Sequence, residues 1–336
     1  MVSKIDWEDR IGRRLKLRDL HVYFAVVQCG SMAKAAAQLG VSQPTVSEII
    51  ADLEHTFGVR LLDRVARGVE PTMYGNALLK RGIAAFDELK QSTRDIAFLA
   101  DPTIGELKIG CAESIAAAVL PAIIERFGQQ YPRVVVRVDD VPSTELTMLR
   151  ERQHDLIVAR VTKPLGGDDL NVETLFDDQM VVATDSRNPW ARRRKIALAE
   201  LIDEPWILSP PDTWAYLRLA EAFQALGLAM PKASFVTLSV HLRNHLLASG
   251  RFISVFPKSI ADCYAQKVLP VDLPARPWPV VMVTLKNRTL SPIVERFLEC
   301  ARDIAKSAYP GPKTTSHSTS RRSWRGPQAT TPMSRV

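Results

Sequence analysis

Small polar side chains cluster in the segment 42–48, which has the order Ser-Gln-Pro-Thr-Val-Ser-Glu. The amide of Gln43 can form two hydrogen bonds with an adenine edge, while Pro44, Thr45 and Ser47 suit thymine methyl groups and phosphates. Glu48 would repel phosphate but could accept a hydrogen bond from a cytosine amino group. This chemistry predicts recognition of double-stranded DNA by one face of a helix.

Three helices are predicted to position that face. Apolar residues recur at helical spacing in three pieces between residues 17 and 57, separated by Gly30 and by residues 40–42. Ser31 and Ser42 are good N-caps for the second and third pieces. The three-residue connection allows only a sharp corner, and small Ala36 sits where the two helices would cross. An ordinary helical hairpin would not need hydrogen-bonding residues on the exposed start of its last helix, so we predict a helix-turn-helix.

Residues 59–71 are predicted to form a wing, two short strands around a turn. Arg64 and Arg67 near its tip are placed for phosphates or a minor groove, with solvated surface arginines as the alternative. Thr72 is predicted to cap a helix that runs to about Ala100. That helix carries more apolar residues than an isolated surface helix requires. We therefore expect a dimerisation seam formed by Leu79, Ile83, Phe86, Leu89, Ile96 and Leu99.

Residues 106–306 alternate short apolar runs with helix patterns, which predicts a parallel sheet with helices on both faces. Such sheets bind ligands beyond the carboxyl ends of their strands, next to helix N-termini. Residues with hydroxyl groups stand at the predicted turns, although each is also explained as an N-cap: Ser114, Ser143, Thr144, Ser209 and Ser239. Thr237 adds another hydroxyl at a strand end, and Arg160, at the end of the third strand, could neutralise a carboxylate. An anionic ligand is therefore expected.

Two stretches resemble the LysR-type family of transcriptional regulators. Residues 17–75 resemble its DNA-binding domain closely, through Ala35-Ala36-Ala37-Gln38-Leu39, residues 41–47, Leu61-Leu62-Asp63-Arg64, residues 68–72 and Gly75. The run 105–110, Leu120-Pro121, Tyr131-Pro132 and residues 250–257 are similar to its effector domain. Members commonly carry Arg or Lys where this chain has Glu48. The resemblance extends over about residues 17–306.

This resemblance implies that Gln43, Pro44, Thr45 and Ser47 face the major groove and that the wing arginine lies along the DNA backbone. We add Ser31 and Thr72, at helix starts, to the DNA-contacting set. The family resemblance also implies a two-lobed, periplasmic-binding-protein-like effector domain. In such a domain, a small molecule between the lobes changes how a dimer or tetramer binds DNA. The cleft positions implied are Ser114, Thr144, Arg160, Thr237 and Phe256. RNA polymerase is the further partner expected of such a regulator.

We therefore expect an α+β multidomain chain. Its predicted parts are an N-terminal extension (1–16), a winged helix-turn-helix (17–71), a linker and dimerisation helix (72–100), a two-lobed α/β effector-binding domain (101–306) and a disordered basic tail (307–336). The tail holds five Lys or Arg and no Asp or Glu, and it supplies most of the formal charge of +7. Net charge alone is therefore no evidence for DNA binding.

Other functions are less well supported. The chain lacks GxGxxG, GKS or GKT, HExxH and GxSxG motifs, so we predict neither an enzyme nor a cofactor. His241 and His245 have the spacing of metal ligands without a third ligand nearby, and an amphipathic helix explains them. The four cysteines lie far apart, so no metal site is expected. We expect a cytoplasmic protein with reduced thiols. No apolar run approaches the ~18 residues of a membrane span. Two alternatives stay open: a ligand-independent architectural DNA-binding protein, and a redox sensor acting through Cys111.

Overall fold

The computed structural model describes residues 14–309, except 67, 144 and 162–164. The parts of the predicted N-terminal extension and tail at 1–13 and 310–336 lie outside the described residues. Three helices open the fold: α1 (Leu17–Cys29), α2 (Met32–Leu39) and α3 (Gln43–Phe57). Each ends at a glycine in the left-handed conformation, Gly30, Gly40 and Gly58, with φ of 62°, 67° and 70°. Their core includes Ala36 and Val46 at the predicted crossing of α2 and α3.

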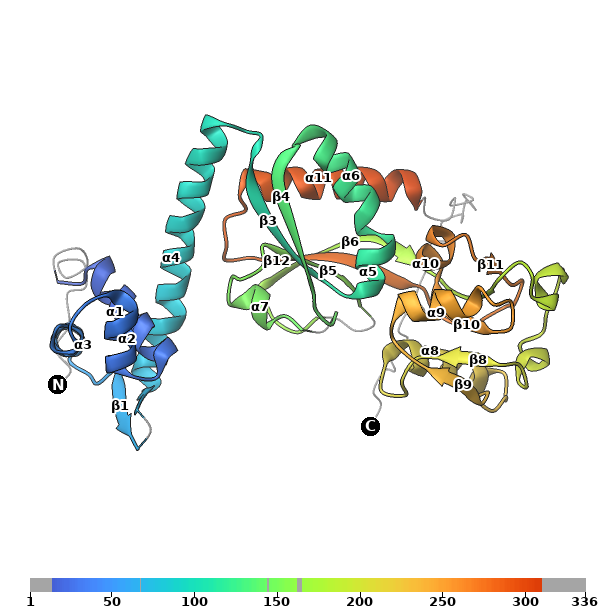
Figure 1. The fold of residues 1–336 in the computed structure, drawn as a ribbon, viewed down its shortest axis with the longest axis horizontal. Coiled ribbons are helices and arrows are strands. Elements are labelled where there is room, and N and C mark those ends of the chain that lie inside the picture. The colour runs from blue at the N-terminus through green and yellow to red at the C-terminus, as the bar shows by residue number, and fades with distance from the viewer. Residues whose placement is uncertain (1–13, 67, 144, 162–164, 310–336) are drawn as a thin grey trace, which may run out of the picture.

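The predicted wing is an antiparallel hairpin of β1 (Leu62–Val65) and β2 (Gly68–Pro71). The Val69 amide donates to the Gly30 carbonyl at 3.0 Å, which ties the wing to the corner between α1 and α2. Helix α4 (Met73–Ala100) follows and reaches from this domain to the next part of the chain (Figure 1). Its first turn is capped by Thr72, whose hydroxyl accepts from the Gly75 amide at 3.1 Å.

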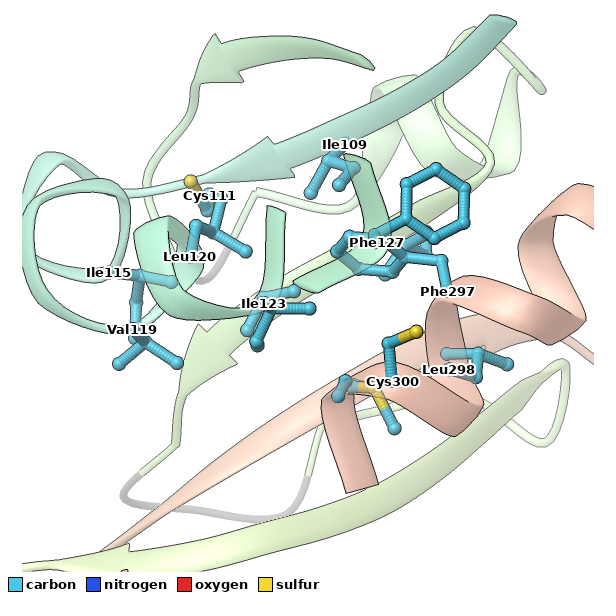
Figure 2. Close-up of a cluster of buried hydrophobic side chains, with 14 of the residues drawn as sticks. Ile109, Cys111, Ile115, Val119, Leu120, Ile123, Phe127, Phe297, Leu298 and Cys300 are labelled. Carbon is cyan, nitrogen blue, oxygen red and sulfur yellow. The ribbon is translucent and has the colours of Figure 1, made fainter. Parts of the chain in front are cut away.

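The remaining chain forms two α/β lobes, each with a five-stranded sheet (Figure 1). Lobe 1 has the strand order β4-β3-β5-β12-β6, and its strands are β3 (Ile104–Cys111), β4 (Arg133–Asp140), β5 (Leu156–Arg160), β6 (Leu170–Asp178) and β12 (Trp278–Leu285). Its helices are α5 (Glu113–Ala118), α6 (Leu120–Gln130), α7 (Thr147–Arg150) and α11 (Pro292–Ala308). Residues of β3, α5, α6 and α11 meet in its main core, where Phe127 and Phe297 pack edge to face (Figure 2).

Lobe 2 has the strand order β11-β7-β10-β8-β9. Its strands are β7 (Met180–Thr184), β8 (Trp206–Leu208), β9 (Ala233–Val236), β10 (Ile253–Pro257) and β11 (Lys267–Val268). Its helices are α8 (Trp214–Ala225), α9 (Val240–Leu247) and α10 (Lys258–Cys263), with 3-10 turns at Pro189–Arg192 and Leu198–Leu201. Ala118 of α5 packs into a core of this lobe with residues of α9 and α10, so α5 touches both lobes.

The expectation of an all-parallel sheet was wrong. Strand β12 runs antiparallel to both β5 and β6, and β7 runs antiparallel to β10 and β11. The reason is connectivity, because the chain crosses from lobe 1 to lobe 2 after β6 and returns through β12. Strand β6 is an edge strand with mostly exposed or half-buried side chains, so no short apolar run marks it in the sequence. Helices α5 and α6 are separated at Val119, and α7 is a single turn.

Candidate DNA-binding and effector sites

The exposed start of α3 is held rigidly by its own cap. The Ser42 hydroxyl accepts from the Thr45 amide at 3.3 Å and lies 2.8 Å from the Thr45 hydroxyl. Gln43, Pro44 and Glu48 are exposed, and Thr45 is half-buried. Behind this surface, Val46, Ile49, Ile50 and Leu53 are buried in the three-helix core. The arrangement presents an amide and a carboxylate on a fixed helix start, the chemistry that base edges can pair with.

Two other predicted contact residues, Ser47 and Thr72, have internal partners. Ser47 donates to the sulfur of Met32 in α2 at 3.4 Å, which places its hydroxyl in the joint between the helices. The Thr72 hydroxyl donates to the Arg60 carbonyl at 2.8 Å besides capping α4. Ser31 has the backbone conformation of an N-cap, but its side chain makes no cap hydrogen bond. Arg64 is exposed on the wing, whereas Arg67 lies outside the described residues.

Some apolar residues of α4 pack against the helix-turn-helix domain, and others remain exposed to solvent. Phe86 packs edge to face on Phe24 of α1 with centroids 5.5 Å apart, and Leu79 borders the three-helix core. Gly82 lies directly against the Phe24 ring, where a Cβ atom would clash. Ile83 is only partly exposed, at 36%. Three residues keep larger exposed areas and share one face by their spacing of seven and three: Leu89 (46%), Ile96 (69%) and Leu99 (76%).

A first polar cluster joins the lobes around Arg160. Its guanidinium donates to Asp178 at 2.9 Å, to the Ser114 hydroxyl at 2.8 Å and to the Ser259 hydroxyl of α10 at 2.8 Å. Burial lowers the pKa of Arg160, and the neighbouring Asp178 carboxylate opposes that shift. Ser114 stands inside α5, because the helix begins at Glu113, two residues earlier than a cap role for Ser114 would require. Arg160 thus has an internal counter-ion and is not presented to a ligand in this conformation.

A second cluster surrounds Arg243 of α9, which sequence reasoning missed. Its guanidinium donates to the Ser209 hydroxyl at 3.0 Å and to the carbonyls of Thr237 at 2.7 Å and Val255 at 3.1 Å. Phe256 packs on it, with the guanidinium carbon 5.1 Å from the ring centroid. Three predicted effector residues, Ser209, Thr237 and Phe256, therefore gather around one buried cation. Ser143 lies in the turn after β4, and Thr144 lies outside the described residues.

Glu113 connects the two lobes and was also missed. Its carboxylate accepts from the amides of Val240 at 3.1 Å and His241 at 3.4 Å, at the first turn of α9. A signal for Arg243 was available, because Val240, Arg243 and Leu247 follow the spacing i, i+3, i+7 of an apolar face. No comparable pattern marks Glu113, since its partners lie 127 and 128 residues away in sequence.

Neither the surface hollows nor the arrangement of possible metal ligands in the described residues indicates a binding site besides the two polar clusters. One hollow of about 490 Å³ lies on lobe 2 beside Trp190 and Arg251, and one of about 510 Å³ lies between α4 and lobe 1 beside Arg152. Neither is lined by a predicted effector residue, whereas the buried polar clusters around Arg160 and Arg243 contain four of them, Ser114, Ser209, Thr237 and Phe256, besides Arg160 itself. Across residues 14–309, apart from the gaps, no group of three His, Cys, Asp or Glu is arranged to hold a metal. In the same part of the chain, no helix is both long and apolar enough to cross a membrane.

A winged helix-turn-helix, joined by a long helix to two α/β lobes that meet through polar contacts, defines a transcriptional regulator with an effector-binding domain. Residues 17–76 match the bacterial regulatory helix-turn-helix model of the lysR family, and residues 100–306 match the LysR substrate binding domain. The chain belongs to the LysR family of DNA-binding transcriptional regulators, and it is not an enzyme.

Named relatives agree with this assignment. The regulator TdcA of Escherichia coli is 27% identical over 303 residues, 88% of this chain and 95% of that protein. A protein of Mycobacterium leprae, named as a probable hydrogen peroxide-inducible genes activator, is 31% identical over 243 residues, 72% of this chain and 78% of that protein. The structure of a full-length OxyR variant from Pseudomonas aeruginosa shares the fold, with a TM-score of 0.56, 22% identity, and coverage of 87% of this chain and 95% of that one.

Proposed function

We propose that this regulator binds two-fold symmetric DNA as a homodimer or homotetramer, and that a small anionic metabolite between the lobes changes the geometry of the bound assembly. In this proposal residues 17–71 bind DNA, 72–100 dimerise and 101–306 bind the effector. RNA polymerase is the partner that responds to the bound assembly, which places the protein in the cytoplasm. The single observation that carries the proposal is the exposed, capped start of α3, with Gln43 at its first position.

Dimerisation is supported by the apolar face of α4. Leu89, Ile96 and Leu99 are exposed on a helix whose other sides pack against α1 and lobe 1. Exposed apolar residues at such spacing are covered when a second helix packs on them. A dimer places two copies of α3 on one DNA duplex, as half-sites related by two-fold symmetry require. The seam is thus narrower than the six residues expected from sequence, because Leu79 and Phe86 pack within their own chain.

Effector control is supported by the polar contacts between the lobes. Arg160 and Asp178 of lobe 1 bond to Ser259 of lobe 2, and Glu113 of lobe 1 bonds to the start of α9. Hydrogen bonds of this kind can be exchanged for bonds to a ligand at small net cost. A ligand shifts the protein only if it binds the two geometries unequally, and regulation needs a difference of about 1–3 kcal/mol.

Footprinting tests the proposal. Operator DNA selected from a random pool is footprinted with the purified protein, with and without organic acids and sugar acids chosen by thermal shift. We expect two half-sites, and a changed footprint with at least one acid. Ile96→Glu should shift the sedimenting species toward monomer and weaken operator binding, whereas Glu125→Gln, an exposed change on α6, should do neither. Footprints that no compound changes would favour a ligand-independent architectural protein instead.

A further inference from the structure

The Glu113 carboxylate occupies the N-terminus of a helix in the opposite lobe. It belongs to α5 of lobe 1, and both of its oxygens lie 3.1 Å from the Val240 amide of lobe 2. The first turn of α9 already has its own cap, because the Ser239 hydroxyl accepts from the Leu242 amide at 3.3 Å. The amides of Val240 and His241 are therefore left to Glu113. Free amides and the helix dipole favour a negative charge at this position.

Arg243 places a positive charge beneath the same helix start. Its side chain is 6% exposed, and its three acceptors are uncharged oxygens, including the Thr237 carbonyl just before α9. Its Nε atom finds no partner within the described part of the chain. Burial lowers the pKa of Arg243 to about 10, and the charge of Glu113 opposes that shift, so the side chain stays charged at neutral pH. A buried cation without an ion-pair partner is costly unless an anion is bound nearby.

These two observations describe one anion site, which is formed by lobe 2 and filled by lobe 1. Lobe 2 supplies the amides and the cation, while lobe 1 supplies the carboxylate on α5. Ser209, Thr237 and Phe256 surround Arg243, so the site contains three of the residues expected to bind an effector. Arg160 does not take part, because its charge is balanced by Asp178. Glu113 therefore resembles a tethered carboxylate ligand that holds the lobes together.

We propose that the N-terminus of α9 and Arg243 form a carboxylate-binding site, that Glu113 is its internal occupant, and that the effector carries a carboxylate that displaces Glu113. The role of the effector in this inference rests on the proposed function. Displacement breaks a contact between the lobes as the ligand binds, so the ligand has unequal affinity for the joined and released arrangements. That inequality is what a regulatory ligand needs.

Chemical rescue tests the site without DNA. Glu113→Ala removes the internal carboxylate, and acetate is the smallest free carboxylate that could replace it. The full-length protein is unfolded thermally in increasing acetate, with sodium chloride at matched ionic strength and neutral acetamide as controls. We expect Glu113→Ala to unfold at a lower temperature than wild type and to be restored saturably by acetate. Glu125→Ala, which removes an exposed carboxylate of the same lobe, should show no specific acetate effect.

Succinate and benzoate extend the test to displacement. Without the internal competitor, Glu113→Ala should be half-saturated by these acids at concentrations at least about tenfold lower than wild type. Adding Arg243→Gln should abolish the response. If Glu113→Ala does not fold alone, its refolding yield in acetate against acetamide replaces the unfolding temperature. Acetate acting no better than acetamide, or equal half-saturation of wild type and variant, would overturn the inference, and operator binding measured separately would show whether the proposed function stands.

Discussion

Arg288 and Asp87 join the effector domain to the middle of α4 although 201 residues separate them in sequence. The Arg288 guanidinium donates to both carboxylate oxygens of Asp87, at 2.8 and 3.2 Å. It also lies 3.0 Å from Asp155 and donates to the His154 carbonyl at 2.7 Å. Both members of the pair are buried, at 6% and 8% exposure. The orientation of the linker helix against lobe 1 is thus set by a buried ion pair.

Arg288→Met should destabilise the protein by about 1–3 kcal/mol, because the buried Asp87 and Asp155 carboxylates lose their shared cation while Arg152 still pairs with Asp87 at 2.8 Å. Urea unfolding measures the loss, and hydrogen exchange should show faster opening in the middle of α4. The matched control is Arg296→Met, which removes an arginine from the exposed pair with Glu299 and should cost about 0–1 kcal/mol. Equal losses in the two variants would mean that the Arg288 contact is not structural.

Gly82→Ala should destabilise the protein even though alanine is the better helix former. The gain in helix propensity is about 1 kcal/mol, but the added methyl group must displace the Phe24 ring, which costs about 1–3 kcal/mol. Gly128→Ala in α6 is the control, since nothing lies within 4 Å of its added Cβ atom. That variant should be stabilised by about 0.5–1 kcal/mol. Thermal unfolding of the two variants should therefore shift in opposite directions.

Gln43→Ala should cost about 1–3 kcal/mol on the operator and relax preference at one base position in each half-site. The reason is the exposure of the Gln43 amide at the first position of α3. Binding titrations against the operator and its single-base variants measure both effects. Arg64→Ala on the wing should instead weaken binding to all sequences alike. A Gln43→Ala protein that keeps full preference at every position would contradict the role of this side chain.

Cys111 should resist alkylation in the native protein, which tests the redox alternative. It is buried at 1% exposure, and burial raises the pKa of its thiol to about 12, with the Asp140 charge adding to the shift. The reactive thiolate is therefore scarce up to that pH. Iodoacetamide labelling followed by mass spectrometry should modify the exposed Cys263 first and Cys111 only after unfolding. Rapid labelling of native Cys111 would restore the redox hypothesis.

Deleting residues 311–336 should leave the fold and the preference for the operator intact. The deletion removes all five cations of the basic tail, so nonspecific affinity for DNA should fall modestly. The salt dependence of nonspecific binding should also become shallower. Thermal unfolding and titrations at several salt concentrations measure these quantities. A loss of unfolding cooperativity on truncation would show that the segment has a structural role.

The sequence by itself determined the local features of this protein. Glycines at positions 30, 40 and 58, the Ser42 cap and the apolar spacing of α3 specify a helix-turn-helix, because capping and left-handed turns depend on neighbouring residues only. The wing and the start of α4 at Thr72 follow for the same reason. The exposed start of α3 could therefore be predicted in detail.

Only the tertiary structure decided which charges meet. Arg160 was expected to neutralise the carboxylate of a ligand, but its guanidinium lies 2.9 Å from Asp178. The two residues meet because β5 and β6 both flank β12. Glu113 escaped notice because its carboxylate reaches the first amides of α9 only when α5 packs across the two lobes. Pairing of this kind depends on how distant strands are ordered in a sheet, and periodicity along the chain carries no information about that order.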